Sequence, residues 1–266
     1  MIRLILLGVL LPVAAAAQSP AASTCTAGDC QNGRGTFVYA TDGATYVGQF
    51  AGGLPNGEGR VASPADSSVY TGTFRDGLYH GQGRLEVPSG VYEGAFSDDA
   101  ASGEGFLVYA ASFSRARYAG AFSDGKPDGA GVLTYRDGFV YTGTVRAGRR
   151  DGLGRSVRPD GWSVAGRFAG DSLSGESTVR FPTGTTWQGQ IAGEQSVGNG
   201  EWADAQGPFA QGPYTDPPRV RAAAGPAARR PAEPGRPDIL DSWRRTPPAA
   251  GEVVIPIYRG RNRPRP

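Results

Sequence analysis

The segment Tyr70-Thr-Gly72-Thr-Phe74 decides the fold, because it returns along the chain at a nearly constant interval. Tyrosine, glycine and phenylalanine recur in the same spacing, and successive copies begin 22 to 26 residues apart. Self-similarity at this period predicts a repeat architecture, in which each unit buries its apolar face against its neighbours. The other copies, increasingly degenerate toward the C-terminus, begin at Tyr46, Tyr92, Tyr118, Tyr141, Val164 and Trp187.

Within each copy the large residues stand at positions i and i+4, with glycine at i+2. In a strand these three positions share one face, and the residues between them are small or polar, so the pattern predicts a half-buried strand. Two further glycines follow at i+11 and i+13 and lead into a second strand. Glycine weakens a strand unless another group approaches closely. We therefore expect an aromatic ring of the neighbouring strand to lie over the bare backbone.

These positions define two sets of candidate residues. The aromatic face, as a structural or binding surface, consists of Tyr46, Phe50, Tyr70, Phe74, Tyr92, Phe96, Tyr118, Phe122, Tyr141, Phe168 and Trp187. The repeat glycines are Gly48, Gly57, Gly59, Gly72, Gly81, Gly83, Gly94, Gly103, Gly105, Gly120, Gly129, Gly131, Gly143, Gly152 and Gly154.

Turn residues separate the predicted strands. Asp76-Gly77 and Asp124-Gly125 follow the first strand of their units, and Asp-Gly supplies the positive φ angles that tight hairpin turns require. The sequence therefore predicts an all-β fold, an elongated single-layer antiparallel β-meander of tandem hairpin repeats. A globular β-barrel is the alternative, although it would not need so strict a period.

The repeated unit resembles the MORN repeat (membrane occupation and recognition nexus), and the chain is identified as a secreted protein of bacterial type within that family. The resemblance implies a twisted single-layer meander, sometimes dimeric, that serves as a scaffold or binding surface. Residues 18–45 look like a half-unit that caps the N-terminus, and residues 46–206 hold about seven repeats. Near the C-terminal boundary, Trp202, Phe209 and Tyr214 are expected to form an irregular cap.

The first 17 residues predict a secretory signal peptide that is cleaved after Ala17. Arg3 provides a positive start, Leu4 to Val13 an apolar run, and Ala15-Ala16-Ala17 a cleavage motif. An uncleaved anchor helix and a lipoprotein are the alternatives. Export to the periplasm or beyond would allow Cys25 and Cys30, the only cysteines, to form a disulfide. Free thiols and a metal site are the alternatives. The metal site lacks ligands, because the chain has a single histidine and no further cysteine.

Residues 207–266 are rich in proline, arginine and alanine, and they predict a disordered tail. From residue 215 onward there are eleven arginines and five acidic residues, a surplus of six positive charges. Two apolar clusters in this region, Ile239–Trp243 and Val253–Tyr258, are candidate docking segments or simply adhesive clusters.

No catalytic constellation stands out from the repeats. His80 occupies a position where other units carry Asn, Ser or Asp, which predicts a turn residue. The pairs Asp98/Asp99 and Asp124/Asp128 invite a glycosidase interpretation, but their repeat-equivalent places favour solvated turn residues. We therefore expect no enzyme activity, no cofactor, no metal, no small-molecule substrate and, after export, no nucleic-acid partner.

Two functions remain. The favoured hypothesis is a non-catalytic scaffold of the cell envelope that binds a protein partner, or a second copy of itself, through the aromatic face. The alternative is a peripheral binder of anionic membrane or another envelope polyanion, through the repeats and the basic tail.

Overall fold

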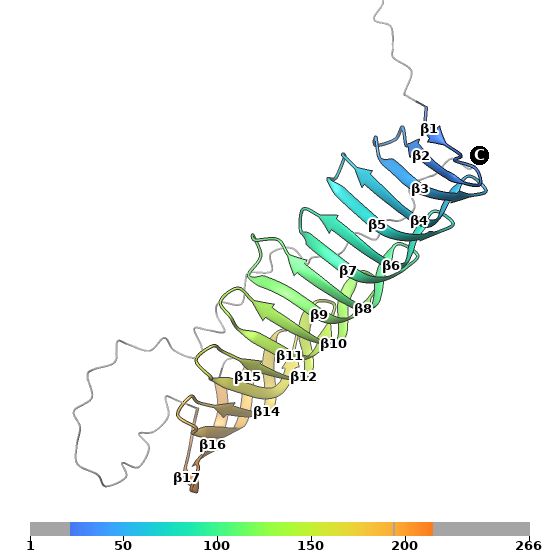
Figure 1. The fold of residues 1–266 in the computed structure, drawn as a ribbon. Coiled ribbons are helices and arrows are strands. Elements are labelled where there is room, and N and C mark those ends of the chain that lie inside the picture. Colours follow the sequence, from blue (N-terminus) through green and yellow to red (C-terminus); the bar gives the residue numbers. More distant parts are fainter. Residues whose placement is uncertain (1–21, 194, 215–266) are drawn as a thin grey trace, which may run out of the picture.

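A computed structural model describes residues 22–193 and 195–214. Within these residues the chain forms one antiparallel sheet without helices, in which each strand pairs with its neighbours in the sequence (Figure 1). The predicted all-β meander is confirmed. The strands are β1 (Thr24–Gly28), β2 (Arg34–Val38), β3 (Thr45–Ala51), β4 (Leu54–Ser63), β5 (Ser68–Arg75), β6 (Leu78–Val87), β7 (Gly90–Ser97), β8 (Ala100–Tyr109), β9 (Arg115–Ser123), β10 (Lys126–Tyr135), β11 (Val140–Arg146), β12 (Arg149–Val157), β13 (Ser163–Ala169), β14 (Ser172–Arg180), β15 (Thr186–Gly193), β16 (Gln195–Asp204) and β17 (Gly207–Gly212).

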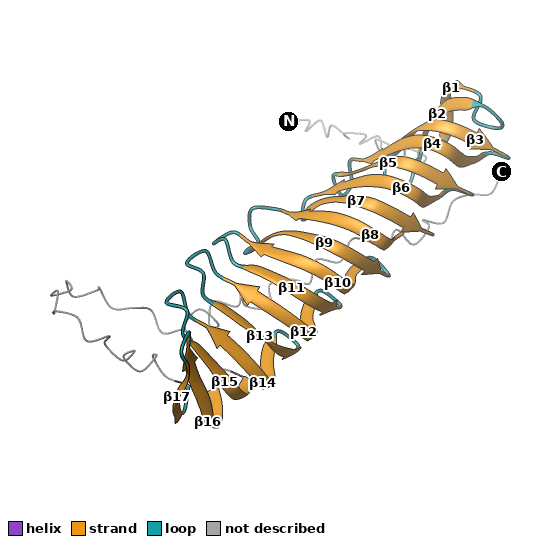
Figure 2. Cartoon of the chain, turned by 60° about the horizontal axis from the view of Figure 1, so that its bottom comes forward, coloured by secondary structure: helices purple, strands orange, loops and turns teal. Residues whose placement is uncertain are grey.

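The strands lie side by side along the axis of a long, open, single-layer sheet (Figure 2). From β3 to β16 they form successive hairpins, one for each copy of the sequence repeat. Side chains alternate between the two faces, and from β3 to β16 one face is buried while the other is exposed, as the pattern of β5 illustrates. We call these the inner face and the outer face.

Two-residue turns join the strands of the six hairpins from β3–β4 to β13–β14. Asp76 and Gly77 have φ angles of 49° and 81°, and Asp124 and Gly125 have 48° and 77°. Positive φ at both central residues is typical of a type I′ turn, whose twist matches that of the flanking strands. The predicted role of these Asp-Gly pairs is therefore correct.

The glycines at i+11 and i+13, both in the second strand of each unit, have different structural roles. Gly103 has a φ of 69°, a left-handed conformation that favours glycine, and it lies where the register of the hairpin shifts. Gly105 has ordinary strand geometry, but a Cβ atom there would lie 2.5 Å from the ring of Tyr92. The first glycine thus permits a bulge, and the second leaves room for a ring. The same division recurs in Gly57/Gly59, Gly81/Gly83, Gly129/Gly131 and Gly152/Gly154.

The unit that begins at Val164 provides an internal test of the ring-on-glycine interpretation. Val164 replaces the tyrosine, and the residue 13 positions later is Ser177 instead of glycine. Gly175, two residues earlier, is retained and has a φ of 84°. The glycine under the ring is thus lost where the ring is lost, whereas the glycine at the bulge stays.

The C-terminal boundary differs from the prediction. β17 begins at Gly207, where the sequence predicted the start of the disordered tail, and it pairs with β16. Its apolar residue Phe209 packs against the core, as does Tyr214, which stacks near Trp202. This apolar packing offsets the high local content of glycine and proline. The predicted signal peptide 1–17, the segments Ile239–Trp243 and Val253–Tyr258, and the tail from residue 215 onward lie outside the described residues.

One core position of β12 departs from the repeat. Ser156 is fully buried between Tyr141 and Val164, and its hydroxyl has no hydrogen-bond partner in the described part of the chain. Other units place apolar residues at this position, as at Leu133 of β10. An unsatisfied buried hydroxyl costs roughly 1–3 kcal/mol. Ser156→Val is therefore expected to stabilise the protein by about 1 kcal/mol, measured as a higher denaturation midpoint. Ser123→Val, on an exposed position, should change the midpoint little, and a lower midpoint for Ser156→Val would contradict the prediction.

Candidate functional site

The predicted aromatic face forms the core of the protein. Tyr46, Tyr70, Tyr92 and Tyr118 are at most 1% exposed, and none of the phenylalanines that accompany them exceeds 6%. The rings of Tyr46, Tyr70 and Tyr92 each pack edge to face on a phenylalanine of their own unit and on one of the next unit, as Tyr46 does at 5.0 Å from Phe50 and 4.9 Å from Phe74. The face therefore has a structural role, and the expectation that a partner contacts these rings is not met in this conformation, since the strands and the rings cover one another.

The tyrosine hydroxyls stabilise this core by hydrogen bonds to backbone carbonyl oxygens. The hydroxyl of Tyr92 donates to the carbonyl oxygen of Ala95 at 2.9 Å, and that of Tyr118 donates to Ala121 at 3.0 Å. Each ring thereby crosses the glycine at i+2 and ends at the carbonyl of residue i+3. Buried tyrosine hydroxyls require such a partner. The same bond is made by Tyr46 to Gln49, by Tyr70 to Thr73 and by Tyr141 to Thr144.

This core should respond to alkaline pH. Burial raises the pKa of Tyr109 and of Tyr141 to about 12, and it raises the pKa of Tyr70, Tyr92 and Tyr118 as well. A raised folded-state pKa contributes stability that is present below the unfolded pKa, roughly 10, and is lost as pH rises through the folded value. We expect tyrosinate absorbance to rise together with loss of the far-UV circular dichroism of the sheet. Titration of most tyrosines near pH 10 with the sheet intact would contradict this.

Two of the candidate polar residues lie differently from their predicted places. His80 belongs to the strand β6 instead of a turn, next to Gly81, whose φ is 66°. Asp99 is a turn residue as expected, but it is 1% exposed instead of solvated. Its carboxylate accepts a hydrogen bond from the backbone N–H of Tyr79 at 2.7 Å. The carboxylates of Asp98 and Asp99 thus satisfy structural partners, Arg75 and Tyr79 respectively.

A second, partly buried carboxylate joins units that are not adjacent. Asp171, in the turn between β13 and β14, accepts hydrogen bonds at Oδ1 from the backbone N–H and from Nε of Arg150, at 3.0 and 3.1 Å. Its other oxygen lies 3.6 Å from Nη2 of Arg115, at the start of β9. The Arg150 guanidinium also lies over the ring of Phe168. The sequence showed no local signal for this triad, because the sheet brings the start of one strand next to a turn two units away.

The outer face contains the unexplained feature of the molecule. Phe106, Ala119 and Val132 are cross-strand neighbours in β8, β9 and β10, and Val108 stands two residues from Phe106 on the same face. Phe106, Val108 and Val132 are 37%, 43% and 36% exposed. We call these four residues the outer patch.

The repeat itself does not require the outer patch. Phe106 and Val132 stand at position i+14 of their units, where three other units carry Arg60, Arg84 and Arg155. All five residues belong to the same row of cross-strand pairs. A position that accepts arginine in neighbouring repeats has no need of an apolar side chain for folding. The sequence alignment of units at i+14 was the available signal for this site, but attention to the aromatic face at i and i+4 missed it.

The charges around the outer patch are uneven. On the N-terminal side, Arg84 is neutralised by Glu86 and Glu93. On the C-terminal side, no ion pair within the described ranges engages Arg117 or Arg155. The same holds for Arg167 and Arg180, which are also exposed on the outer face. The described residues contain no group of acidic, histidine or cysteine side chains arranged for a metal ion, and no helix among them is long and apolar enough to cross a membrane.

Comparison with known proteins supports the repeat assignment. The family model of the MORN repeat matches five segments, residues 46–64, 70–91, 92–111, 118–140 and 141–163. These are the first five units found in the sequence, and MORN repeats are in general interaction repeats without catalysis of their own. The units that begin at Val164 and Trp187 lie outside the matched ranges, in keeping with their degenerate pattern.

No curated protein matches the chain. Among solved structures, a mutant of the TCP10 domain of Danio rerio CPAP is similar at 17% identity and a TM-score of 0.35, over 67% of this chain and 77% of that one. The TCP domain of SAS-4 from Drosophila melanogaster, solved in complex with a proline-rich motif of Ana2, matches at 14% identity and a TM-score of 0.28, over 79% of this chain and 98% of that one.

Proposed function

We propose that this protein is a non-catalytic scaffold of the cell envelope that binds a protein partner through the outer patch. The observation that carries the proposal is the change from arginine to Phe106 and Val132 at a repeat position that tolerates charge. Exposed apolar side chains that gather on one surface mark interaction sites more often than singly scattered ones do. The signal pattern of residues 1–17 supports placement in the envelope, where Cys25 and Cys30 would be oxidised.

The partner surface differs from the one expected from sequence. The rings of the inner face are buried, so an interaction through them would require the sheet to open. The outer patch is accessible without any change of conformation, because Phe106, Val108 and Val132 are each more than one third exposed. Aromatic and aliphatic anchors at the centre of a patch with a polar rim are typical of protein interfaces.

The test uses the repeat's own alternative residues. Phe106→Arg/Val132→Arg gives the outer patch the side chain that other units carry, so the fold should remain and circular dichroism should be unchanged. We expect recovery of crosslinked envelope proteins from intact cells to fall about tenfold, as the loss of one interface anchor implies. The matched control is Val47→Arg/Leu153→Arg, which changes two exposed apolar residues of the same face outside the patch. Equal recovery with both double variants would overturn the proposal.

A second candidate function is binding to an anionic surface, favoured by the four outer-face arginines without ion pairs. Each cation near such a surface contributes about 1 kcal/mol at low salt. Flotation with anionic liposomes, compared with neutral ones, tests it. If the full-length protein floats only with anionic lipid, and Arg117, Arg155, Arg167 and Arg180 changed to glutamine abolish this, the membrane function replaces the protein scaffold.

A further inference from the structure

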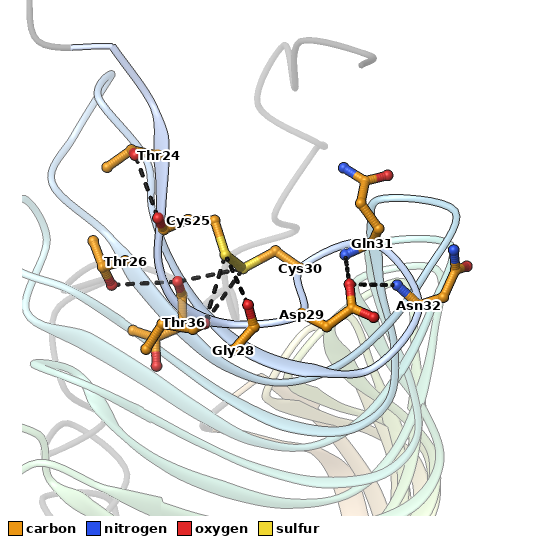
Figure 3. Close-up of a disulfide and its surroundings, with 10 residues drawn as sticks. Thr24, Cys25, Thr26, Gly28, Asp29, Cys30, Gln31, Asn32 and Thr36 are labelled. Carbon is orange, nitrogen blue, oxygen red and sulfur yellow. Dashed lines mark hydrogen bonds between the residues drawn. A yellow bond between two sulfur atoms is a disulfide. The ribbon is translucent and has the colours of Figure 1, made fainter.

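The N-terminal edge of the sheet is held by an unusual strand. β1 pairs with β2 and leaves all five of its residues exposed, so it contributes no apolar side chain to the core. Its register is broken between Cys25 and Ala27 by a bulge. Cys25 forms the predicted disulfide with Cys30, in the loop between the two strands (Figure 3). β1 is therefore an edge strand retained by backbone pairing, by the hydrogen bond from the Thr26 hydroxyl to Thr36 and by one covalent bond.

The register places this disulfide where the other units have their tyrosine. Gly28 pairs with Gly35 as Gly48 pairs with Gly59 in the first full repeat. Counting back from the glycine pair, Cys25 lies opposite Phe37 as Tyr46 lies opposite Val61. Cys25 thus occupies the cross-strand position of the repeat tyrosine.

Cys30 lies over the glycine of the facing strand, where the other units place the tyrosine ring. A Cβ atom on Gly35 would lie 2.7 Å from Sγ of Cys30, just as a Cβ on the equivalent Gly59 would meet the ring of Tyr46. Cys30 is 6% exposed and belongs to the core. Its sulfur lies 3.4 Å from the carbonyl oxygen of Thr36, a contact and not a hydrogen bond, because a disulfide has no S–H. The disulfide therefore covers the terminal glycine in place of a ring.

We propose that the Cys25–Cys30 disulfide is a redox-sensitive lock on the N-terminal edge of the sheet. A dithiol reductant supplies two electrons and two protons, the S–S bond breaks, two thiols form, and the reductant becomes a disulfide. Without the covalent link β1 has no buried side chain to hold it, and it leaves β2. The unpaired backbone groups of β2 then pair with β2 of a second copy.

A second copy through β2 is the occupant that the two edges favour. A free edge strand is a template for pairing with another chain, and two identical strands can pair antiparallel about a twofold axis. The opposite edge is protected in both redox states. β17 carries Pro208, which has no N–H to donate, and a bulge at Phe209. Dimers through β2, and not open chains of molecules, are therefore the expected product.

The test compares the full-length chain in oxidised form, after dithiothreitol, and as Cys25→Ser/Cys30→Ser, by light scattering after size-exclusion chromatography and by amide hydrogen exchange. We expect a monomer when oxidised, and a twofold higher mass for the reduced chain and the double variant over a concentration series. Exchange of residues 24–28 should accelerate, while that of β5 to β8 stays unchanged, which excludes general unfolding.

A third variant tests whether the exposed edge of β2 is the contact between the two copies. The Thr36 carbonyl faces β1, where the hydroxyl of Thr26 donates to it, and in a strand the N–H of a residue points to the same side as its carbonyl. Thr36→Pro, added to the serine variant, removes an edge donor without touching the bonds to β3 and should restore the monomer. Unchanged exchange in residues 24–28 after reduction, a reduced chain that stays monomeric, or a dimer that survives Thr36→Pro would each overturn the proposal.

Discussion

Gly105→Ala is expected to destabilise the protein by about 3 kcal/mol, the upper range for inserting a group into a packed core. The new Cβ would lie 2.5 Å from the Tyr92 ring, which cannot retreat because Phe96 and Phe122 pack against it at 5.1 and 4.7 Å. Displacing the ring would also break the hydrogen bond from its hydroxyl to Ala95. Denaturant unfolding followed by far-UV circular dichroism measures the change.

The neighbouring glycine supplies the matched control. Asparagine adopts left-handed geometry more readily than other residues, so Gly103→Asn should cost only about 1 kcal/mol, the scale of the left-handed strain. The nearest atom to a Cβ there is 3.7 Å away. Gly105→Asn should be as severe as Gly105→Ala. Equal effects of asparagine at both positions would show that the ring does not exclude a side chain at Gly105.

The unit that begins at Val164 suggests a double variant in which a side chain at position 105 should be tolerated. Tyr92→Val alone removes a buried ring and should cost about 3 kcal/mol. Tyr92→Val combined with Gly105→Ser recreates the pair Val164/Ser177, so the serine should then add little further loss. We expect a coupling of about 2 kcal/mol between the two positions. Additive losses would contradict the ring-on-glycine account.

Much of the fold was readable from the sequence because its rules are local. The pairing of Tyr92 with Gly105 spans 13 residues and repeats in every strong unit, so its period is visible without any structure. The turn at Asp76-Gly77 likewise depends only on residues that are adjacent in the sequence. The separate roles of Gly103 and Gly105 were not predicted, since both belong to one Gly-x-Gly pattern and it is the φ angles and the distance to the Tyr92 ring that distinguish them.

The candidate site was harder to read for a physical reason. Repetition draws attention to residues that recur, but a binding surface on a repeat protein consists of residues that depart from the period. Phe106 and Val132 are such departures, and they lie on the face opposite to the conspicuous rings. Asp171 was missed for another reason, because Arg115 is two units away in the sequence and only the three-dimensional fold brings the two charges together.

Asp171→Ala is expected to cost about 3–5 kcal/mol, because it leaves the buried Arg150 and the half-buried Arg115 without a counter-charge. The side chains of Arg150 and Arg115 are only 6% and 22% exposed, so water screens them poorly. The backbone N–H of Arg150 also loses its acceptor, Oδ1 of Asp171. Denaturation midpoints at neutral pH should fall far more than for Asp98→Ala, since the ion pair of Asp98 with Arg75 is more than half exposed on both sides.

A second variant distinguishes two causes of the lost stability, the unpaired arginine charges and the broken hydrogen bond to the backbone of Arg150. If the unpaired charge dominates, Arg150→Met in the Asp171→Ala background should recover part of the stability, because methionine keeps the apolar contact with Phe168 and removes one of the two facing cations. If the backbone bond to Arg150 dominates, the methionine variant should be no more stable than Asp171→Ala alone. Recovery would identify Asp171 as the counter-ion that allows β9 and the β13–β14 turn, four strands apart in the sheet, to share one charged cluster.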